Sequence, residues 1–97
     1  MAYEITLAPE ARDDFRGLGA YYRASVRNAI NEHLRHWPTR LSKSRIKRLR
    51  GMNSPQYRLR VGDLRVFYDV DGTEVAILGI VDKPRAAEWL RKRGAKP

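Results

Sequence analysis

The strongest constraint on the fold is a run of alternating residues, Tyr57-Arg58-Leu59-Arg60-Val61, followed at once by Gly62-Asp63. Apolar and basic side chains repeat here with the period of two that places them on opposite faces of a β-strand. Glycine in the first position of a two-residue loop is typical of a type II′ hairpin turn, so residues 64–70 are predicted to return antiparallel. Asp71-Gly72 then predicts a type I′ turn into a third strand over residues 73–81.

Two-residue turns fix the pairing of the strands, and the pairing assigns each side chain to a face. In the first hairpin Arg60 is predicted to lie opposite Arg65, and Arg58 opposite Phe67. In the second hairpin the same reasoning places Tyr68 opposite Val75. The predicted core face consists of Tyr57, Leu59, Val61, Leu64, Val66, Tyr68, Val70, Val75, Ile77 and Gly79. The other face carries Arg58, Arg60, Arg65, Phe67, Asp69, Ala76, Leu78 and Ile80.

The remaining elements are predicted from periodicity and from turn residues. Residues 3–7 alternate as a short strand, and Pro9 suits the first turn of a helix that ends at Gly17 and Gly19. A second helix is expected from Ala20 to Trp37, where Pro38 stops it. Its apolar stripe consists of Val26, Ala29, Ile30, Leu34 and Trp37.

Residues 39–56 are expected to be irregular, and a last helix is expected from Pro84 to Arg93, with Asp82 as N-cap and Gly94 as the stop. The predicted fold class is therefore α+β. An N-terminal strand and a helical hairpin pack on a twisted, mainly antiparallel four-stranded sheet, with a short C-terminal helix. All of residues 1–97 are expected to form a single domain.

Charge is the composition's most informative property. Twenty Lys and Arg against eleven Asp and Glu give a net charge of +9, and residues 40–60 hold eight basic residues and no acidic one. A concentrated positive charge favours a polyanionic partner, with affinity that falls steeply as salt rises. Cysteine is absent, the N-terminus lacks the pattern of a signal peptide, and no apolar run approaches a membrane span. A soluble, cytoplasmic protein without membrane contact is expected.

The predicted hairpin register brings three arginines together. Arg60 directly opposite Arg65 costs stability, up to about 1 kcal/mol, because like charges in a strand pair repel. With Arg58 beside them, the three guanidinium groups form a candidate phosphate site, since planar bidentate donors match phosphate oxygens. Asp69 is the one carboxylate predicted on this face, and we expect it to orient an arginine.

The element order and four segments resemble the RelE/ParE toxins of bacterial toxin–antitoxin pairs, RelE more closely than ParE. The resemblance covers essentially the whole chain. Its segments are Leu49-Arg50-Gly51-Met52, then Gln56 to Arg60, then Gly62 to Val70, and Ile80-Val81-Asp82-Lys83.

The resemblance implies an activity as well as a fold. RelE-like toxins enter the ribosomal A site and cut mRNA by promoting attack of a ribose 2′-hydroxyl on the adjacent phosphate, and no cofactor is implied. Arg58, Arg60 and Arg65 match basic positions on the strands, and Arg85 is implied as a fourth catalytic position. The expected RNA-binding residues are Arg45, Lys47, Arg48, Arg50 and Lys83. The implied partners are a cognate antitoxin, the ribosome with its mRNA and, for the toxin–antitoxin pair, operator DNA.

Two departures from RelE leave alternatives open. Leu90 stands where RelE has a catalytic tyrosine, and Arg60 stands where a lysine serves as general base, although arginine hardly ever releases its proton. Cleavage is then expected to be slow, or to use groups of the ribosomal RNA. A ParE-like toxin that inhibits DNA gyrase by binding alone is the second hypothesis. A non-toxic nucleic-acid-binding domain is the third.

Other residues are interpreted as structural. His33 and His36 have a helical spacing that can hold a metal, but we interpret them as structural or surface histidines because only Glu32 is near in sequence. Trp37 is predicted to anchor the core. Trp89 is predicted to pack the last helix onto the sheet. Tyr68 is predicted to point into the core, and the Asp13-Asp14 pair is predicted to be solvated.

Overall fold

A mixed sheet organises the structure. In the computed structural model, which describes residues 2–94, five strands lie in the order β1-β5-β4-β3-β2. The strands are β1 (Glu4–Leu7), β2 (Ile46–Arg48), β3 (Tyr57–Val61), β4 (Leu64–Asp71) and β5 (Glu74–Asp82). The helical elements are α1 (Pro9–Arg16), α2 (Ala20–Ala29), the π-helical turn η1 (Ile30–Leu34) and α3 (Lys83–Lys92).

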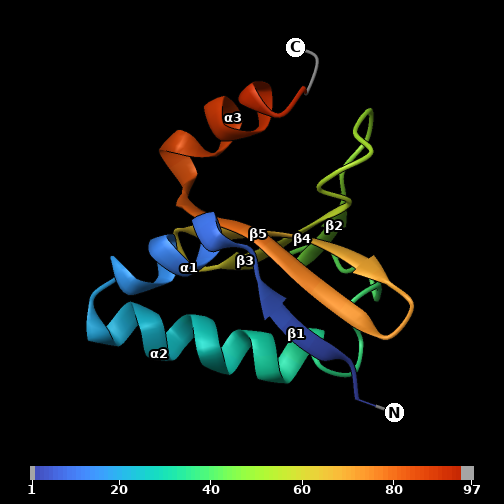
Figure 1. Cartoon of the computed structure of the whole chain (residues 1–97), viewed down its shortest axis with the longest axis horizontal. Coiled ribbons are helices and arrows are strands. Elements are labelled where there is room, and N and C mark those ends of the chain that lie inside the picture. Colours follow the sequence, from blue (N-terminus) through green and yellow to red (C-terminus); the bar gives the residue numbers. More distant parts are fainter. Residues whose placement is uncertain (1, 95–97) are drawn as a thin grey trace.

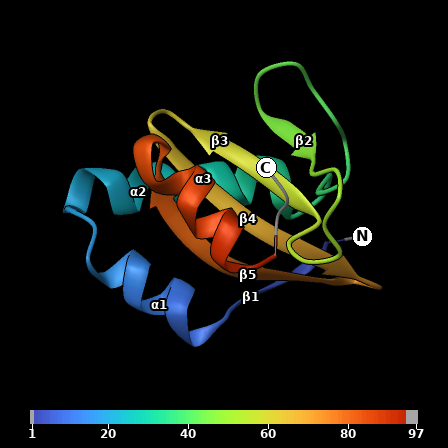
Figure 2. The same cartoon turned by 90° about the horizontal axis from the view of Figure 1, so that it is seen from above.

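Helices cover both faces of this sheet. Figure 1 shows α1 and α2 on one side and α3 on the other, and Figure 2 shows α3 lying across the strands. Strand β1 runs parallel to β5, whereas the other neighbouring strands are antiparallel. The predicted α+β class, with its mainly antiparallel sheet, is confirmed.

The apolar core lies between the sheet and the α1–α2 layer. Leu59, Val66 and Ile77 point into it from three strands and are fully buried, each contributing roughly 1.5–3 kcal/mol by leaving water. Tyr68 is buried there as predicted, and its hydroxyl donates a hydrogen bond of 2.7 Å to the Pro38 carbonyl. Burial raises the pKa of the Tyr68 phenol far above its ordinary value, so this hydroxyl remains a neutral donor.

The first hairpin has the predicted register. Arg60 pairs with Arg65 and Arg58 pairs with Phe67. Gly62 has a φ of 58°, while no residue other than glycine has a positive φ among those described. A positive φ at the first loop position alone is the type II′ geometry, so the turn chemistry read from Gly62-Asp63 holds.

The second hairpin differs from the prediction in two ways. Asp71 pairs with Glu74, so Gly72 is the first loop residue and not the second, and the register is displaced by two residues. An irregularity between Phe67 and Tyr68 then shifts the pairing by one further residue, so that Phe67 lies opposite Gly79. A shift of one residue exchanges the faces, which is why Gly79 lies outside the core and Ile80 inside it, the reverse of the prediction.

The segment 39–56 is not wholly irregular. It contributes β2, the edge strand in which Ile46 pairs with Leu59 and Lys47 pairs with Arg58. The sheet therefore has five strands, one more than the four that were predicted. Ile46 is the only buried residue of this three-residue strand, so its sequence carries too little alternation to be recognised.

The second helix ends earlier than predicted. Regular α-helix stops at Ala29, and η1 continues to Leu34, with the Arg35 amide donating to the Ile30 carbonyl. Trp37 lies beyond the helix and is 60% exposed, so the prediction of a core anchor was wrong. Pro38 fills the buried position instead, because the chain leaves the helical path before the apolar stripe can continue.

The last helix begins at the predicted cap and rests on one aromatic contact. The Asp82 carboxylate accepts a hydrogen bond from the Arg85 amide at the helix start. Trp89 stacks on Phe67 with ring centres 4.7 Å apart, and a Cβ atom at Gly79 would overlap the indole. Trp89 therefore packs α3 onto the sheet as predicted, and the absence of a side chain at Gly79 makes the contact possible. Arg93 covers the other face of the indole and pairs with Glu10 of α1.

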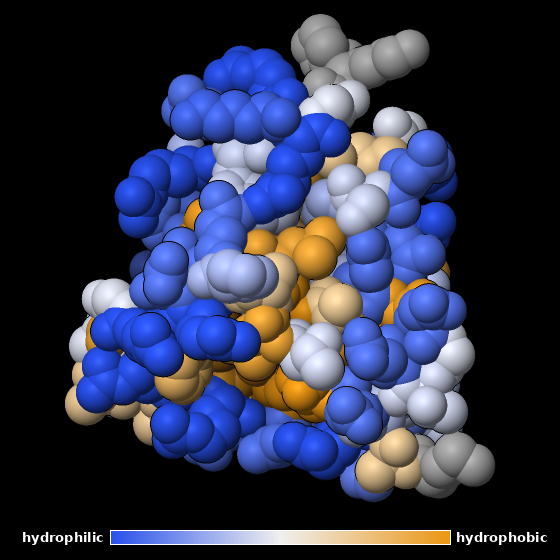
Figure 3. Space-filling model, in the orientation of Figure 1, coloured by the Kyte–Doolittle hydropathy of each residue, from blue (hydrophilic) through white to orange (hydrophobic). Residues whose placement is uncertain are grey.

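The space-filling view in Figure 3, in the orientation of Figure 1, shows mostly hydrophilic side chains around an apolar patch at the centre of the visible surface. A groove of about 230 Å³ lies between β1, α1 and α2. Ile5, Leu7, Phe15 and Ile30 line it, with Arg27 and Arg35 also contributing.

Candidate phosphate-binding face

Four cations share one face of the β2–β3–β4 sheet, and we call this set, Lys47, Arg58, Arg60 and Arg65, the basic face. The pairing of β3 with β4 brings the three predicted arginines together. Lys47 joins them because β2 places it directly opposite Arg58. Sequence analysis assigned Lys47 to an irregular basic loop, and only the pairing of β2 shows that it lies beside the arginines.

Arg65 is the most enclosed member. Only 8% of its surface is exposed, and its guanidinium donates from Nη1 to the carbonyls of Gly62 at 2.9 Å and Leu64 at 3.0 Å. These carbonyls hold the side chain against the turn of the first hairpin without neutralising its charge. A buried charge that is hydrogen-bonded but not paired with an acid is costly to the fold and favours an anion beside it.

Arg58 carries an unsatisfied donor. Its Nε atom is the one buried side-chain nitrogen or oxygen without a hydrogen-bond partner among residues 2–94. Desolvation lowers the pKa of the Arg58 guanidinium, and the neighbouring charges of Arg65 and Arg60 lower it further. A desolvated donor surrounded by like charges is the electrostatic environment that an incoming phosphate oxygen would relieve.

Asp69 does not act as predicted. Its carboxylate accepts hydrogen bonds from the Ser54 hydroxyl at 2.5 Å and from the Gln56 amide at 2.7 Å, so it holds the loop before β3 and orients no arginine. The register explains this, because Asp69 pairs with Ala76 near the far end of β4. The basic face therefore keeps its charge.

The predicted RNA-binding residues of the segment 45–50 lie on or near the basic face, but their side chains differ in orientation. Arg45, Lys47 and Arg50 are exposed. Arg48 is also exposed but bends back over the Tyr57 ring at 5.3 Å and donates to the Gln56 carbonyl at 2.8 Å. Arg48 pairs with Tyr57 across β2 and β3, one position away from the basic face.

Arg85 has acidic partners. Its Nε donates to the Asp82 carboxylate at 3.1 Å, and this bond raises the pKa of Arg85 and lowers that of Asp82. Arg85 also lines a surface pocket with Asp14 and Glu10, next to α1. The described contacts thus tie Arg85 to carboxylates, whereas Arg58, Arg60 and Arg65 interact with one another. Lys83 is exposed at the start of α3, and Leu90 is half-buried farther along the helix.

Asp14 is not simply solvated, as the sequence suggested. Its carboxylate accepts a hydrogen bond of 2.9 Å from the Ile80 amide, which lies just beyond the irregularity in β5. Burial raises the pKa of this carboxyl, and the hydrogen bond partly opposes the shift. Asp14 therefore connects α1 to β5.

The part of the chain that the structure describes contains no clear set of metal ligands. No group of three or more His, Cys, Asp or Glu side chains lies close enough together to hold an ion within residues 2–94. His33 Nε2 lies 3.9 Å from the Glu32 carboxylate. The same residues include no helix long and apolar enough to cross a membrane.

Comparison with known proteins identifies the class of protein. The family described as the ParE toxin of type II toxin–antitoxin systems matches residues 5–86. The chain belongs to this family, and hence to the RelE/ParE superfamily of type II toxins, as the resemblance predicted. Comparison with curated protein sequences gave no significant match.

Solved structures place the fold close to RelE. A chain of the RelBE2 toxin–antitoxin complex from Mycobacterium tuberculosis has a TM-score of 0.72 and 26% identity, covering 84% of this chain and 99% of that chain. A chain of the archaeal RelE–RelB complex from Pyrococcus horikoshii has a TM-score of 0.70 and 24% identity, covering 89% and 100%. A mutant of E. coli RelE in the free state has a TM-score of 0.70 and 23% identity, covering 96% and 94%. Because the last two structures are less than 25% identical to this chain, their similarity shows the fold alone.

Proposed function

We propose that this toxin is a ribosome-dependent mRNA endoribonuclease and that the basic face binds the phosphate at which the RNA is cut. The observation that supports this most directly is the convergence of Arg58, Arg60 and Arg65, with a buried Arg58 Nε that has no partner. The RelE-like fold supports the same function.

The arginines are suited to stabilise charge. Attack of a 2′-hydroxyl on a phosphate adds negative charge to the phosphoryl oxygens in the transition state. Guanidinium groups already fixed in place, as Arg65 is by two carbonyls, need no reorganisation to meet that charge. Removing one such donor typically costs about 10²–10³-fold in rate.

Proton transfer requires a different group, because arginine stays protonated. Lys47 is the amine on the basic face, opposite Arg58, and an amine can give up a proton, whereas a guanidinium hardly ever does. We propose Lys47 as the proton-transfer group that Leu90 and Arg60 do not supply.

The toxin's partner is proposed to be a cognate antitoxin, and the pair is proposed to bind operator DNA. An antitoxin with acidic residues and an amphipathic segment would complement the +9 charge of this chain. It would cover the sheet or displace α3, which buries no residue completely. The groove between β1, α1 and α2 offers such a segment apolar contacts beside Arg27 and Arg35.

Toeprinting on a programmed ribosome tests the nuclease. Purified protein is expected to produce a cut within the A-site codon that is absent without ribosomes and absent with Arg65→Ala. Because Arg65 also holds the turn, Arg60→Ala provides a second variant at an exposed position. A protein that stops growth in cells but leaves the mRNA intact on the ribosome would contradict the proposal.

A gyrase inhibitor is the alternative, and the match to the ParE toxin family favours it. Leu90, in place of the tyrosine of RelE, also favours a toxin without chemistry. Cleaved DNA accumulating on gyrase after induction, with translation unaffected, would support this function. Halted translation with unaffected gyrase would exclude it.

A further inference from the structure

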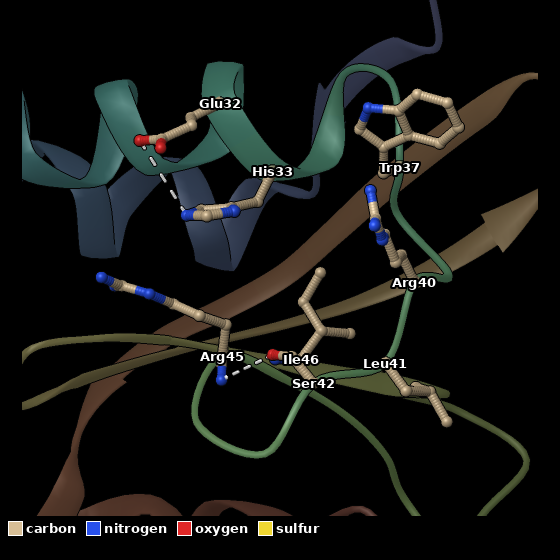
Figure 4. Close-up of a pocket in the computed structure, with 8 residues that line it drawn as sticks. All are labelled: Glu32, His33, Trp37, Arg40, Leu41, Ser42, Arg45 and Ile46. Atoms are coloured by element: carbon tan, nitrogen blue, oxygen red, sulfur yellow. Dashed lines mark hydrogen bonds and ion pairs between the residues drawn. The ribbon is translucent and has the colours of Figure 1, made fainter.

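A second surface feature lies beyond the edge of the basic face. A cleft of about 330 Å³ opens between η1 and the segment that leads into β2. Figure 4 shows Glu32 and His33 projecting from η1 on one side, Arg45 and Ile46 on the other, and Trp37 with Arg40 near one end. We call it the η1–β2 cleft, and its lining is completed by Leu41 and Ser42.

The cleft presents an aromatic surface to solvent. Four large apolar or aromatic side chains are mostly exposed among residues 2–94, and two of them, Trp37 at 60% and Leu41 at 58%, line this cleft. The Arg40 guanidinium lies 5.8 Å from the centre of the Trp37 ring. An exposed indole beside an arginine is the combination on which unpaired bases stack.

The wall that faces η1 is held in place by its own hydrogen bonds. The Ser42 hydroxyl accepts from the amides of Arg45 at 3.0 Å and Ile46 at 3.2 Å. The Ser42 amide donates to the Ile46 carbonyl at 3.0 Å. The cleft is therefore bounded by an ordered turn and by a π-helical turn, a feature that is frequent at functional sites.

Charge identifies the kind of occupant. Residues 39–50 carry six cations and no acid, which are Arg40, Lys43, Arg45, Lys47, Arg48 and Arg50. Arg40 and Arg45 line the cleft together with Trp37, and a nucleotide brings both a phosphate for the cations and a flat base for the indole. His33 and Glu32 add hydrogen-bonding groups to the wall opposite Arg45.

The cleft and the basic face lie on opposite sides of the β2 edge, because Ile46 lines the cleft and pairs with the core residue Leu59, whereas Lys47 faces the other way. The Arg60 amide donates to the Arg45 carbonyl at 2.9 Å, and the Arg45 side chain reaches the Arg60 carbonyl at 3.5 Å. Adjacent strands lie roughly 4.8 Å apart, so a strand of nucleic acid on the basic face needs to cross only the β2 edge to enter the cleft.

We propose that the η1–β2 cleft binds one unpaired nucleotide of RNA, with the base stacked on Trp37 and its phosphate held by Arg40 and Arg45. The site deepens the proposed function, because it extends the RNA contact of the basic face by a base-binding subsite. It selects single strands, since a base inside a duplex has no free face for the indole.

Binding of labelled RNA to the full-length protein tests this site without the ribosome. Fluorescence anisotropy compares a short single-stranded oligoadenylate with an RNA duplex of the same length. Trp37→Ala is expected to weaken single-strand binding about 5- to 100-fold, the loss that corresponds to one stacked base. Trp37→Phe should recover most of the affinity. Tyr21→Ala is the matched control, because Tyr21 is also a mostly exposed aromatic residue and does not line the cleft.

The salt dependence separates stacking from charge. Trp37→Ala should leave the slope of log affinity against log salt unchanged, whereas Arg45→Ala should reduce that slope by about one phosphate contact. Equal affinities for the wild type, Trp37→Ala and Tyr21→Ala would overturn the proposal, as would equal effects of Trp37→Ala on single-stranded and duplex RNA.

The outcome is independent of the nuclease assay. Trp37-dependent binding without any cut on the ribosome would support the cleft and reject the proposed function. A cut that requires Arg65, made by a protein whose RNA binding ignores Trp37, would support the function and reject the cleft. Because Trp37 is exposed, its variants are expected to melt within a few degrees of the wild type, which circular dichroism can verify.

Discussion

The two faces of the sheet differ in what they contribute. The face toward α1 and α2 holds a continuous apolar core, in which Leu59, Val66 and Ile77 are fully buried and the Tyr68 hydroxyl is satisfied. The face toward α3 holds four cations, an unsatisfied Arg58 Nε and one aromatic contact to a helix without fully buried residues. The first face stabilises the fold, and the second retains charge that the fold does not need.

We interpret this difference as the placement of the proposed function on one face at a cost in stability. Like charges opposed across β3 and β4 destabilise a hairpin, and a buried donor without a partner costs about 1–3 kcal/mol. Such features are expected where a ligand completes the electrostatics. The comparison can be tested by changing one face at a time.

Arg58→Met should separate the two contributions most clearly. Cleavage on the ribosome should fall about 10²–10³-fold, because a donor to the transition state is lost. The free energy of unfolding should rise by up to about 1 kcal/mol, since an unsatisfied donor and a like-charge contact disappear. Single-turnover cleavage and urea denaturation measure the two effects. A variant that is less stable yet fully active would reverse our interpretation of this face.

Lys47→Arg keeps the charge on the basic face and removes the group that can transfer a proton. The rate of cleavage should fall roughly 10²-fold, the lower range for loss of general acid–base catalysis, while affinity for RNA stays the same. An unchanged rate would mean that the ribosome supplies both proton-transfer groups. Lys43→Arg, at an exposed position outside the sheet, is the control.

Gly79→Ala should loosen α3 without touching a cation. The new Cβ atom would overlap the Trp89 indole, and crowding of this kind typically costs 1–3 kcal/mol. Because the overlap is specific to one ring, adding Trp89→Leu should recover part of the loss. Chemical denaturation of the two single variants and the double variant measures the coupling. Additive effects would mean that Trp89 does not hold α3 as described.

Asp14→Asn should have the smallest effect, and it probes the first face. The raised pKa of Asp14 means that the folded state binds the proton more tightly than the unfolded state. Its contribution to stability is present below the ordinary pKa of 3.8 and is lost as the pH rises through the raised value. Asparagine keeps an acceptor for the Ile80 amide, so stability should lose this pH dependence and change little at neutral pH. An unaltered profile between acid and neutral pH would contradict the assignment.

Sequence reasoning was reliable where residues close together in the sequence determine the structure. The register of the first hairpin follows from five alternating residues and a Gly-Asp turn, and it brought Arg58, Arg60 and Arg65 onto one face. The cap at Asp82 and the contact of Trp89 with the sheet were also predicted and are confirmed.

Sequence reasoning failed where the structure of a segment depends on a partner that is distant in the sequence. Strand β2 exists because β3 offers it a partner, so the position of Lys47 directly beside the arginines was not predicted. The irregularity in β5 exchanges Gly79 and Ile80 although the local alternation gives no sign of it. Asp69 was expected to orient an arginine, but the Ser54 hydroxyl and the Gln56 amide are its partners.

The most direct test of the account measures the rate and the stability of Arg60→Ala together. Arg60 is exposed on the basic face, and Arg48→Ala is its matched control, because Arg48 is an exposed arginine that pairs with Tyr57 and lies off the basic face. On programmed ribosomes the account predicts at least a 10²-fold slower cut for Arg60→Ala, an unfolding free energy within about 0.5 kcal/mol of the wild type, and near-normal cleavage for Arg48→Ala. Equal rates for the wild type and both variants would contradict the claim that the basic face performs the function of this toxin.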